Sequence, residues 1–198
     1  MSNKGSLTRQ SVIDKSLQIF SVKGYYNASI NDILEATGLT KGGFYGHFAS
    51  KEELWTAAYD KAVEIWKGIV FKGIREIEDP IERLAKTIEN DLLDYIGSGV
   101  FDGGCFFFNN LVELSGQSAP LSGRILRGLE DFSRLLASWL AEAERKGMLK
   151  PGLDLKGIAD FLVVSVNGAA ALYSASRDPR ILRETVMQLG SYLDHLKA

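Results

Sequence analysis

Start and stop signals for helices recur along the whole chain, and they constrain its fold more than any other feature. Apolar residues return at intervals of three and four, and no run alternates apolar with polar residues as a half-buried strand would. Residues that cap helices stand before these runs, and glycine or proline follows them. The pattern predicts an all-α fold with about nine helices joined by short loops.

The predicted helices run from one such signal to the next. Residues 50–53 form a capping box that opens a long helix. Asp79-Pro80 and Asp178-Pro179 each place a capping residue before a proline, which suits the first helical position. The nine predicted helices are 8–24, 29–38, 40–48, 50 to at least 65, 79–96, 105–115, 121–146, 154–174 and 179–197.

Residues that bind metals or form disulfides are scarce. The single cysteine, Cys105, excludes an intramolecular disulfide framework and a cysteine-based zinc cluster. The two histidines, His47 and His195, are far apart in the sequence, so we expect neither a multi-histidine metal site nor a cofactor. Because no apolar stretch follows a basic cap at the N-terminus, we expect no signal peptide and a cytoplasmic location.

The most apolar stretch runs from Ile158 to Ala175 and is long enough to cross a membrane. Asp160, Ser165 and Asn167 lie in this stretch. Their polar side chains favour a buried or interface helix over a membrane span.

The charge is unevenly distributed. Residues 1–51 carry a net charge of +3, while the whole chain carries −2, so the remainder carries −5. A mildly basic N-terminal segment on an acidic body fits a DNA-binding module joined to a body that does not bind DNA.

Residues 29–48 carry the clearest functional signal. Two short capped helices are joined by a tight turn, in which Gly38 supplies a positive backbone angle and Leu39 fills the angle between the helices. This arrangement predicts a helix-turn-helix. In that motif the second helix enters the major groove of DNA with its N-terminal end first.

The helix predicted at 40–48 has a composition that suits contact with DNA. Thr40 and the free amides behind it can bind a phosphate, and Lys41 adds a positive charge. Gly42 and Gly43 each cost roughly 1 kcal/mol relative to alanine inside a helix. Close approach of the backbone to another surface would offset that cost.

Other classes of function have less support. A turn of this kind is also common as a purely structural element, and Phe44 and Phe48 are expected in the core in either case. The chain shows no phosphate-binding loop, zinc-protease motif or nucleophile elbow, so an enzyme is not expected. A helical protein-interaction module would leave Lys41 and Tyr45 unexplained, and salt-dependent DNA binding would distinguish the two.

Residues 8–55 resemble the N-terminal signature of TetR-family regulators. The resemblance rests on the run Phe20-Ser-Val-Lys-Gly-Tyr and on the run from Ser29 to Leu54. The length and the all-helical remainder of the chain also fit. The residues in family register include Gly24, Gly38, Lys41, Gly42, Tyr45, His47, Phe48 and Lys51.

The resemblance implies a DNA-binding domain at residues 1–49 and a ligand-binding and dimerisation domain at 50–198. It also implies two reading heads about 34–36 Å apart on a near-palindromic operator. A small-molecule effector would release the DNA by moving the long fourth helix; repression is assumed from the family, in which a minority activate. By analogy, the residues at the DNA are Ser29, Thr40, Lys41, Gly42, Gly43, Tyr45, His47 and Lys51.

Two positions depart from the family pattern. Ala28 replaces a frequent hydroxyl residue, so one phosphate contact is expected to be missing. Gly43 stands where relatives carry a side chain, so base discrimination would rest on Lys41 and Tyr45.

The last two predicted helices suit a homodimer interface. Small and apolar residues recur on them at helical spacing, which would allow close contact in a four-helix arrangement between two copies. The predicted interface residues are Val163, Val166, Ala170 and Ala171 on one helix and Val186, Leu189 and Leu193 on the other.

The effector is expected to bind among aromatic and isolated polar residues of the body. Buried polar groups need partners, and a ligand is one such partner, although ordinary core packing explains each residue equally well. The candidate pocket or sensor residues are Cys105, Phe106, Asn109, Glu113, Trp139, Asn167 and Tyr173.

Cys105 has two interpretations. Gly104-Cys105 resembles a TetR subgroup in which a cysteine at this place senses electrophiles or oxidants. The predicted helix N-terminus beside it would lower the pKa of the thiol. A lone cysteine among phenylalanines is also a common inert core residue.

Overall fold

The computed structural model describes residues 3–198, with side chains from residue 8 onward. The described chain is all-α, with nine α-helices and no β-strand beyond one isolated bridge, Leu149–Lys197. The α-helices are α1 (Asn3–Asn27), α2 (Ile30–Thr37), α3 (Lys41–Tyr45), α4 (Lys51–Val70), α5 (Pro80–Glu89), α6 (Phe106–Leu114), α7 (Ala119–Arg145), α8 (Leu155–Ser176) and α9 (Pro179–Leu196). A 3₁₀-helix (η1, Ile74–Glu76) and a π-helix (η2, Asn90–Ile96) complete the set.

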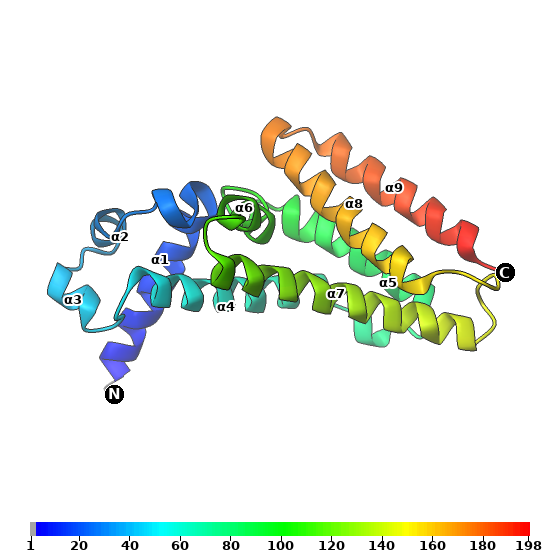
Figure 1. Cartoon of the computed structure of the whole chain (residues 1–198), viewed down its shortest axis with the longest axis horizontal. Helices are drawn as coiled ribbons and strands as arrows, with labels where there is room; N and C mark the ends of the chain where they lie inside the picture. Colours follow the sequence, from blue (N-terminus) through cyan, green and yellow to red (C-terminus); the bar gives the residue numbers. More distant parts are fainter. Residues whose placement is uncertain (1–2) are drawn as a thin grey trace.

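The molecule is elongated, with α1 to α3 at one end and the C-terminus at the other (Figure 1). α1 of the N-terminal head packs against α4 and also against α6 of the helical body. The head and the body share α4. In the body, α7 and α8 pack on each other, and α9 packs on α8 and α5. The long α4 therefore lies in the core of the head at its start and in the body at its end.

The capping residues predicted for α2 and α3 are confirmed. Ser29 Oγ accepts a hydrogen bond from the Asp32 amide at 3.1 Å, while the Asp32 carboxylate accepts one from the Ser29 amide at 2.8 Å. Thr40 Oγ1 accepts from the amide of Gly43 at 3.1 Å. Each bond satisfies an amide that has no partner inside its helix.

Two predicted ends of head helices differ. The helix predicted to start at residue 8, with Thr8 as its cap, reaches back to Asn3, so Thr8 lies inside α1. Gly24 interrupts α1 as predicted, with φ 73°, and a short segment to Asn27 follows the kink. α3 ends at Tyr45 and not at Phe48, although the Phe48 amide still donates to the Phe44 carbonyl at 3.0 Å.

The helix predicted at 79–96 changes type within its length. Its last seven residues form the π-helix η2, in which the Gly97 amide donates to the carbonyl of Leu92, five residues back. The buried Asn90 side chain begins this segment and donates to the carbonyls of Val70 and Lys72. These two hydrogen bonds connect the start of η2 to the end of α4. The periodicity of apolar residues alone does not predict a π-helix here.

The head has its own apolar core, which continues into the core of the body. Phe44 and Phe48 are fully buried, as predicted, and their ring centroids lie 5.9 Å apart. Phe20 of α1 and Ile33 of α2 are buried in the same cluster. The packing of these residues sets the orientation of α3 within the head.

Five of the seven residues predicted for the dimer face are buried within the described chain and so are not available to a second copy, which corrects that part of the prediction. They are Val163, Val166 and Ala170 of α8 and Leu189 and Leu193 of α9. Ala171 and Val186 are half-buried. The exposed large apolar residues of the two helices are Phe161, Val164, Leu172 and Met187.

α8 is long and apolar enough to cross a membrane, with a mean hydropathy of 1.5. Core helices of globular proteins share this length and hydropathy. The buried side of α8 packs on α7 and α9. This packing favours the interface helix that the polar residues in the stretch predict.

Candidate DNA-binding head and effector cavity

The exposed end of the head carries most of the predicted DNA contacts. Thr40, Lys41, Gly42 and Tyr45 are exposed on or next to α3, which lies at the end of the molecule remote from the C-terminus (Figure 1). The Tyr45 side chain packs edge-on against Phe44, with 5.1 Å between ring centroids. A buried ring thus supports an exposed tyrosine at the surface that would face DNA.

The two glycines of α3 have no packing role that would explain them. A side chain on Gly42 would meet no atom within 4 Å, and one on Gly43 would make only ordinary contacts with Thr40 and Leu39, the nearest at 3.4 Å. Neither position is required to be glycine by the protein's own packing. The open space in front of Gly42 suits the close approach of another molecule.

The charges of the head leave one cation free. Among the basic side chains of residues 8–51, only Lys41 makes no hydrogen bond or ion pair. Lys15 donates to the Ala36 carbonyl, and Arg9 and Lys23 pair with carboxylates of the head. Lys41 at the start of α3 is therefore available to a phosphate or a base edge.

Three other predicted contacts lie around α3. Ser29 is exposed at the start of α2, while Gly43 and His47 are half-buried. Lys51 lies differently, because its ammonium donates to the carbonyls of Tyr25 and Ala28 at 2.8 and 2.9 Å. Burial lowers the pKa of this ammonium. Lys51 thus fastens α4 to the end of α1, and its contact with phosphate stays a prediction.

A carboxylate from the body closes the joint between head and body. Glu113 of α6 accepts hydrogen bonds from the amides of Tyr25 and Tyr26, at 2.6 and 2.9 Å. These amides follow Gly24, where the Glu113 carboxylate occupies the space that a side chain would need. With φ 73° as well, this position favours glycine on two independent grounds.

The body contains a cavity of about 510 Å³, within the range of small-molecule sites. It lies between α4, η2, α6, α7 and α8. Its aromatic and aliphatic walls include Tyr59, Val63, Trp66, Phe71, Tyr95, Phe107, Ile125, Phe132 and Val166. Its polar and charged lining includes Asp60, Lys67, Asp91, Cys105, Arg124, Arg127, Asp131 and Asn167.

Of the predicted effector residues, the structure brings Cys105 and Asn167 to this cavity. The other five lie elsewhere, which corrects the prediction. Phe106 is buried beside Trp55, and Asn109 donates to the Gly103 carbonyl. Glu113 closes the joint, Trp139 lies under the Arg83 guanidinium, and the Tyr173 ring lies 6.0 Å from the guanidinium of Arg177.

Sequence reasoning missed the acidic and phenolic groups of the cavity. Asp91 and Tyr95 are buried on η2, four residues apart. A signal for Asp91 was present, because it follows Leu84 and Ile88 at helical spacing and so places an acid on an apolar stripe.

Of the two interpretations of Cys105, its environment favours the core residue over the activated sensor. Its thiol is buried, and desolvation is the main cause that raises its pKa to about 12. The backbone amides of Phe108 and Phe107 at the start of α6 act in the opposite direction, as predicted, but their effect is smaller. The structure therefore gives a protonated, unreactive thiol at neutral pH.

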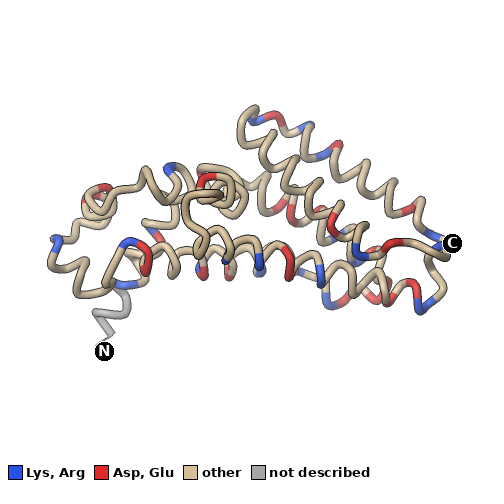
Figure 2. Tube along the Cα trace, in the orientation of Figure 1, with Lys and Arg blue, Asp and Glu red and all other residues tan. Residues whose placement is uncertain are grey.

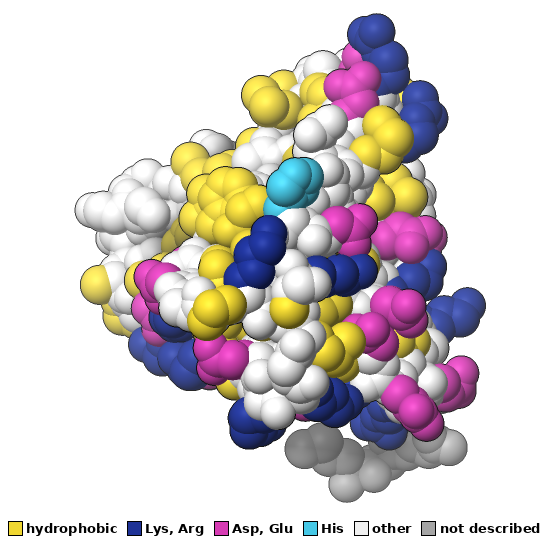
Figure 3. All heavy atoms as spheres, turned by 90° about the vertical axis from the view of Figure 1, so that its right-hand side faces the viewer, with side chains coloured by type: hydrophobic (Ala, Val, Ile, Leu, Met, Phe, Trp, Pro, Cys, Tyr) yellow, Lys and Arg dark blue, Asp and Glu magenta, His cyan; other side chains and the backbone are white. Residues whose placement is uncertain are grey.

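Charges of both signs are interspersed over the body (Figure 2). At the end of the molecule that holds the C-terminus, hydrophobic, basic and acidic side chains lie side by side (Figure 3). In residues 3–198, no group of three or more histidine, cysteine or acidic side chains could hold a metal ion. The body thus shows neither a nucleic-acid-binding charge pattern nor a metal centre in its described part.

Comparison with known proteins decides the family. Residues 80–189 match the domain described as "Tetracyclin repressor-like, C-terminal domain", and residues 12–58 match "Bacterial regulatory proteins, tetR family". The chain belongs to the TetR family. This TetR-family chain is therefore a helix-turn-helix transcriptional repressor that binds DNA, and it is not an enzyme.

Relatives of this TetR-family repressor share most of its length. The transcriptional repressor ComR of Escherichia coli is 28% identical over 81% of this chain and 76% of its own. DhaR of a Mycobacterium species is 27% identical over 81% and 79%. A TetR regulator of Chloroflexus aurantiacus has a crystal structure that superposes with a TM-score of 0.92 at 26% identity, covering 99% of this chain and 98% of that one.

Gly42→Ala should separate DNA binding from folding. We expect the repressor to lose about 1–3 kcal/mol of operator binding, the usual cost of forcing a methyl group into a close contact. Stability to heat should stay equal or rise, because alanine favours the helix and no protein atom opposes it. Gly68→Ala in α4, where space is equally open, should leave DNA binding unchanged. Fluorescence anisotropy and thermal melting measure both effects, and unchanged affinity in Gly42→Ala would refute the DNA-contact role.

Cys105 should resist thiol reagents in the folded repressor. At pH 7 we expect its reaction with Ellman's reagent to be about 10³-fold slower than in the urea-unfolded chain, because the thiolate is the reacting form. Absorbance at the released thiolate follows both reactions. Rapid stoichiometric labelling of the native protein would instead support an activated cysteine.

Proposed function

We propose that this TetR-family repressor is a homodimer released from a near-palindromic operator by a small molecule that enters the cavity of the body. Residues 1–49 would form the DNA-binding domain and residues 50–198 the effector-binding and dimerisation domain. The observation that carries the proposal is that one short helix, α6, borders the cavity with Phe107 and bonds the head with Glu113. The repressor would act in the cytoplasm, where operator DNA is found.

α6 and α4 provide the route from effector to DNA. α4 lines the cavity with Tyr59, Val63 and Trp66, and its first residue, Lys51, is bonded to the end of α1. A ligand that displaces α4 or α6 would act on the joint after Gly24 from two sides. Because the two heads of a dimer must match one spacing on DNA, a small rotation at this joint would lower affinity.

The exposed apolar stripe of α8 supports dimerisation. Phe161, Val164 and Leu172 are 48%, 68% and 63% exposed and stand at intervals that place them on one side of the helix. Met187 of α9 is 62% exposed, and Tyr192 of α9 packs against Phe161 with ring centroids 5.2 Å apart. An apolar surface that spans two adjacent helices suits a four-helix contact with a second copy.

Selection of bound duplexes from a random DNA pool tests the function directly. We expect an enriched, near-palindromic sequence that wild-type protein binds tightly and Tyr45→Ala binds weakly, with affinity that falls steeply as salt rises. Screening small molecules for release of this duplex then tests the effector. A chain that enriches no sequence, even after unfolding and refolding to remove bound ligand, would contradict the proposal.

Val164→Glu should break the dimer. A buried carboxylate without a partner on each side of the interface is strongly unfavourable, so light scattering at micromolar concentration should give the monomer mass. Val112→Glu on α6, where the valine is 60% exposed, is the matched control and should remain dimeric. If both variants had the same mass as wild type, the dimer interface would not lie on the α8 stripe.

A further inference from the structure

Asp91 is a buried acid without a cation beside it. It is 5% exposed, and the Trp66 indole Nε1 donates a hydrogen bond to its Oδ1 at 3.2 Å. None of the ion pairs between described residues includes Asp91. Buried carboxylates in proteins are normally paired with a cation. The described fold supplies no such partner for Asp91.

Aromatic rings line the same cavity as this carboxylate. Trp66 lies edge-on to Phe107 and Phe132, with ring centroids 6.2 and 5.0 Å apart, and Phe107 lies 6.4 Å from Tyr95. All four rings line the cavity together with Asp91. Aromatic faces attract organic cations, and a cavity lined by rings and a carboxylate has the composition of a cation site.

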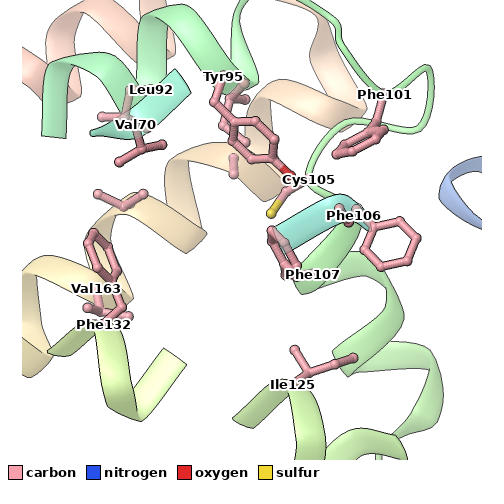
Figure 4. Close-up of a cluster of buried hydrophobic side chains, with 14 of the residues drawn as sticks. Val70, Leu92, Tyr95, Phe101, Cys105, Phe106, Phe107, Ile125, Phe132 and Val163 are labelled. Carbon is pink, nitrogen blue, oxygen red and sulfur yellow. The ribbon is translucent and has the colours of Figure 1, made fainter. Parts of the chain in front are cut away.

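A second polar group in the cavity is also incompletely partnered. The Tyr95 hydroxyl is buried and makes no hydrogen bond of good geometry, and it interacts electrostatically with the Cys105 thiol and the Phe106 backbone beside it. Figure 4 shows this hydroxyl at the inner end of the ring, directed toward Cys105, with Phe107 close by. Asp91 and Tyr95 of η2 both line the cavity, and the side-chain oxygen of each can accept a hydrogen bond from a ligand.

We propose that the effector is a protonated amine with an apolar, aromatic body. Its N–H groups would donate to the Asp91 carboxylate and the Tyr95 hydroxyl, and its body would pack among Trp66, Phe107 and Phe132. This inference rests on the proposed function, since it names the class of molecule that fills the same cavity. A neutral ligand would leave the Asp91 carboxylate without a counter-charge, and an anionic group placed beside Asp91 would be repelled by it.

The ionisation of Asp91 adds a dependence on pH. Burial raises its pKa to about 7, and a bound cation would favour the charged form, so binding would release a proton below that pH. The other charged groups of the cavity are Asp60 and Lys67 on α4 and Arg124, Arg127 and Asp131 on α7. Cys105 and Tyr95 do not ionise near neutral pH, because burial raises the pKa of both.

A matched pair of probes tests the class of ligand without DNA. 2-Naphthylmethylamine and 2-naphthylmethanol have the same body and differ in charge, and calorimetry measures their binding to the full chain. We expect wild-type protein to prefer the amine by about tenfold or more. Asp91→Asn should lose this preference, while Asp131→Asn, which removes an exposed carboxylate at the cavity, should keep it.

A pH series on the wild-type chain is independent of any variant. Affinity for the amine should rise about tenfold between pH 6 and pH 8 as Asp91 ionises, and affinity for the alcohol should stay constant. Equal affinity for both probes, a flat pH profile, or failure of both to bind would overturn the cation proposal. Because operator binding and its release by other compounds are measured separately, these outcomes would leave the proposed function standing.

Discussion

The contact between the Glu113 carboxylate and the two amides that follow Gly24 joins the head to the body, and the other functional features depend on it. The head also meets the body through the continuous helix α4 and through the packing of α1 against α6. Two short hydrogen bonds, at 2.6 and 2.9 Å, fix the end of α1 relative to α6. Charge-assisted bonds of this kind are stronger than neutral ones, so the orientation of α3 is defined by the body.

The same short helix explains why the cavity and the joint are close neighbours. α6 begins at Cys105, which borders the cavity, and bears Glu113 two turns later. Asn110, fully buried between them, accepts a hydrogen bond from the Trp55 indole of α4 and donates to the Phe20 carbonyl of α1. Three helices are thereby connected through one amide side chain. A shift of α6 cannot be absorbed locally, because packed interiors transmit displacement.

Local chemistry made the head predictable, and long-range packing made the cavity unpredictable. Ser29, Thr40 and Gly38 act within their own turns, so their roles follow from neighbours in the sequence. The cavity draws its lining from five separate helices, and no local pattern states which side of each faces inward. The two interpretations of Cys105 stayed open for the same reason, since the effect of its helix start is local while the stronger effect of burial comes from distant residues.

The π-helix at Asn90–Ile96 has a consequence for how this protein can change in evolution. A π-helical turn contains one residue more than the α-helical path it replaces. Removing that residue would restore α-helical winding while the turns before and after it keep their register, because the π-helical turn absorbs the extra residue locally. The change would alter which residues of Asn90–Ile96 face the cavity. A single-codon deletion or insertion could thus replace the chemistry of the cavity in one step while the rest of the body keeps its packing.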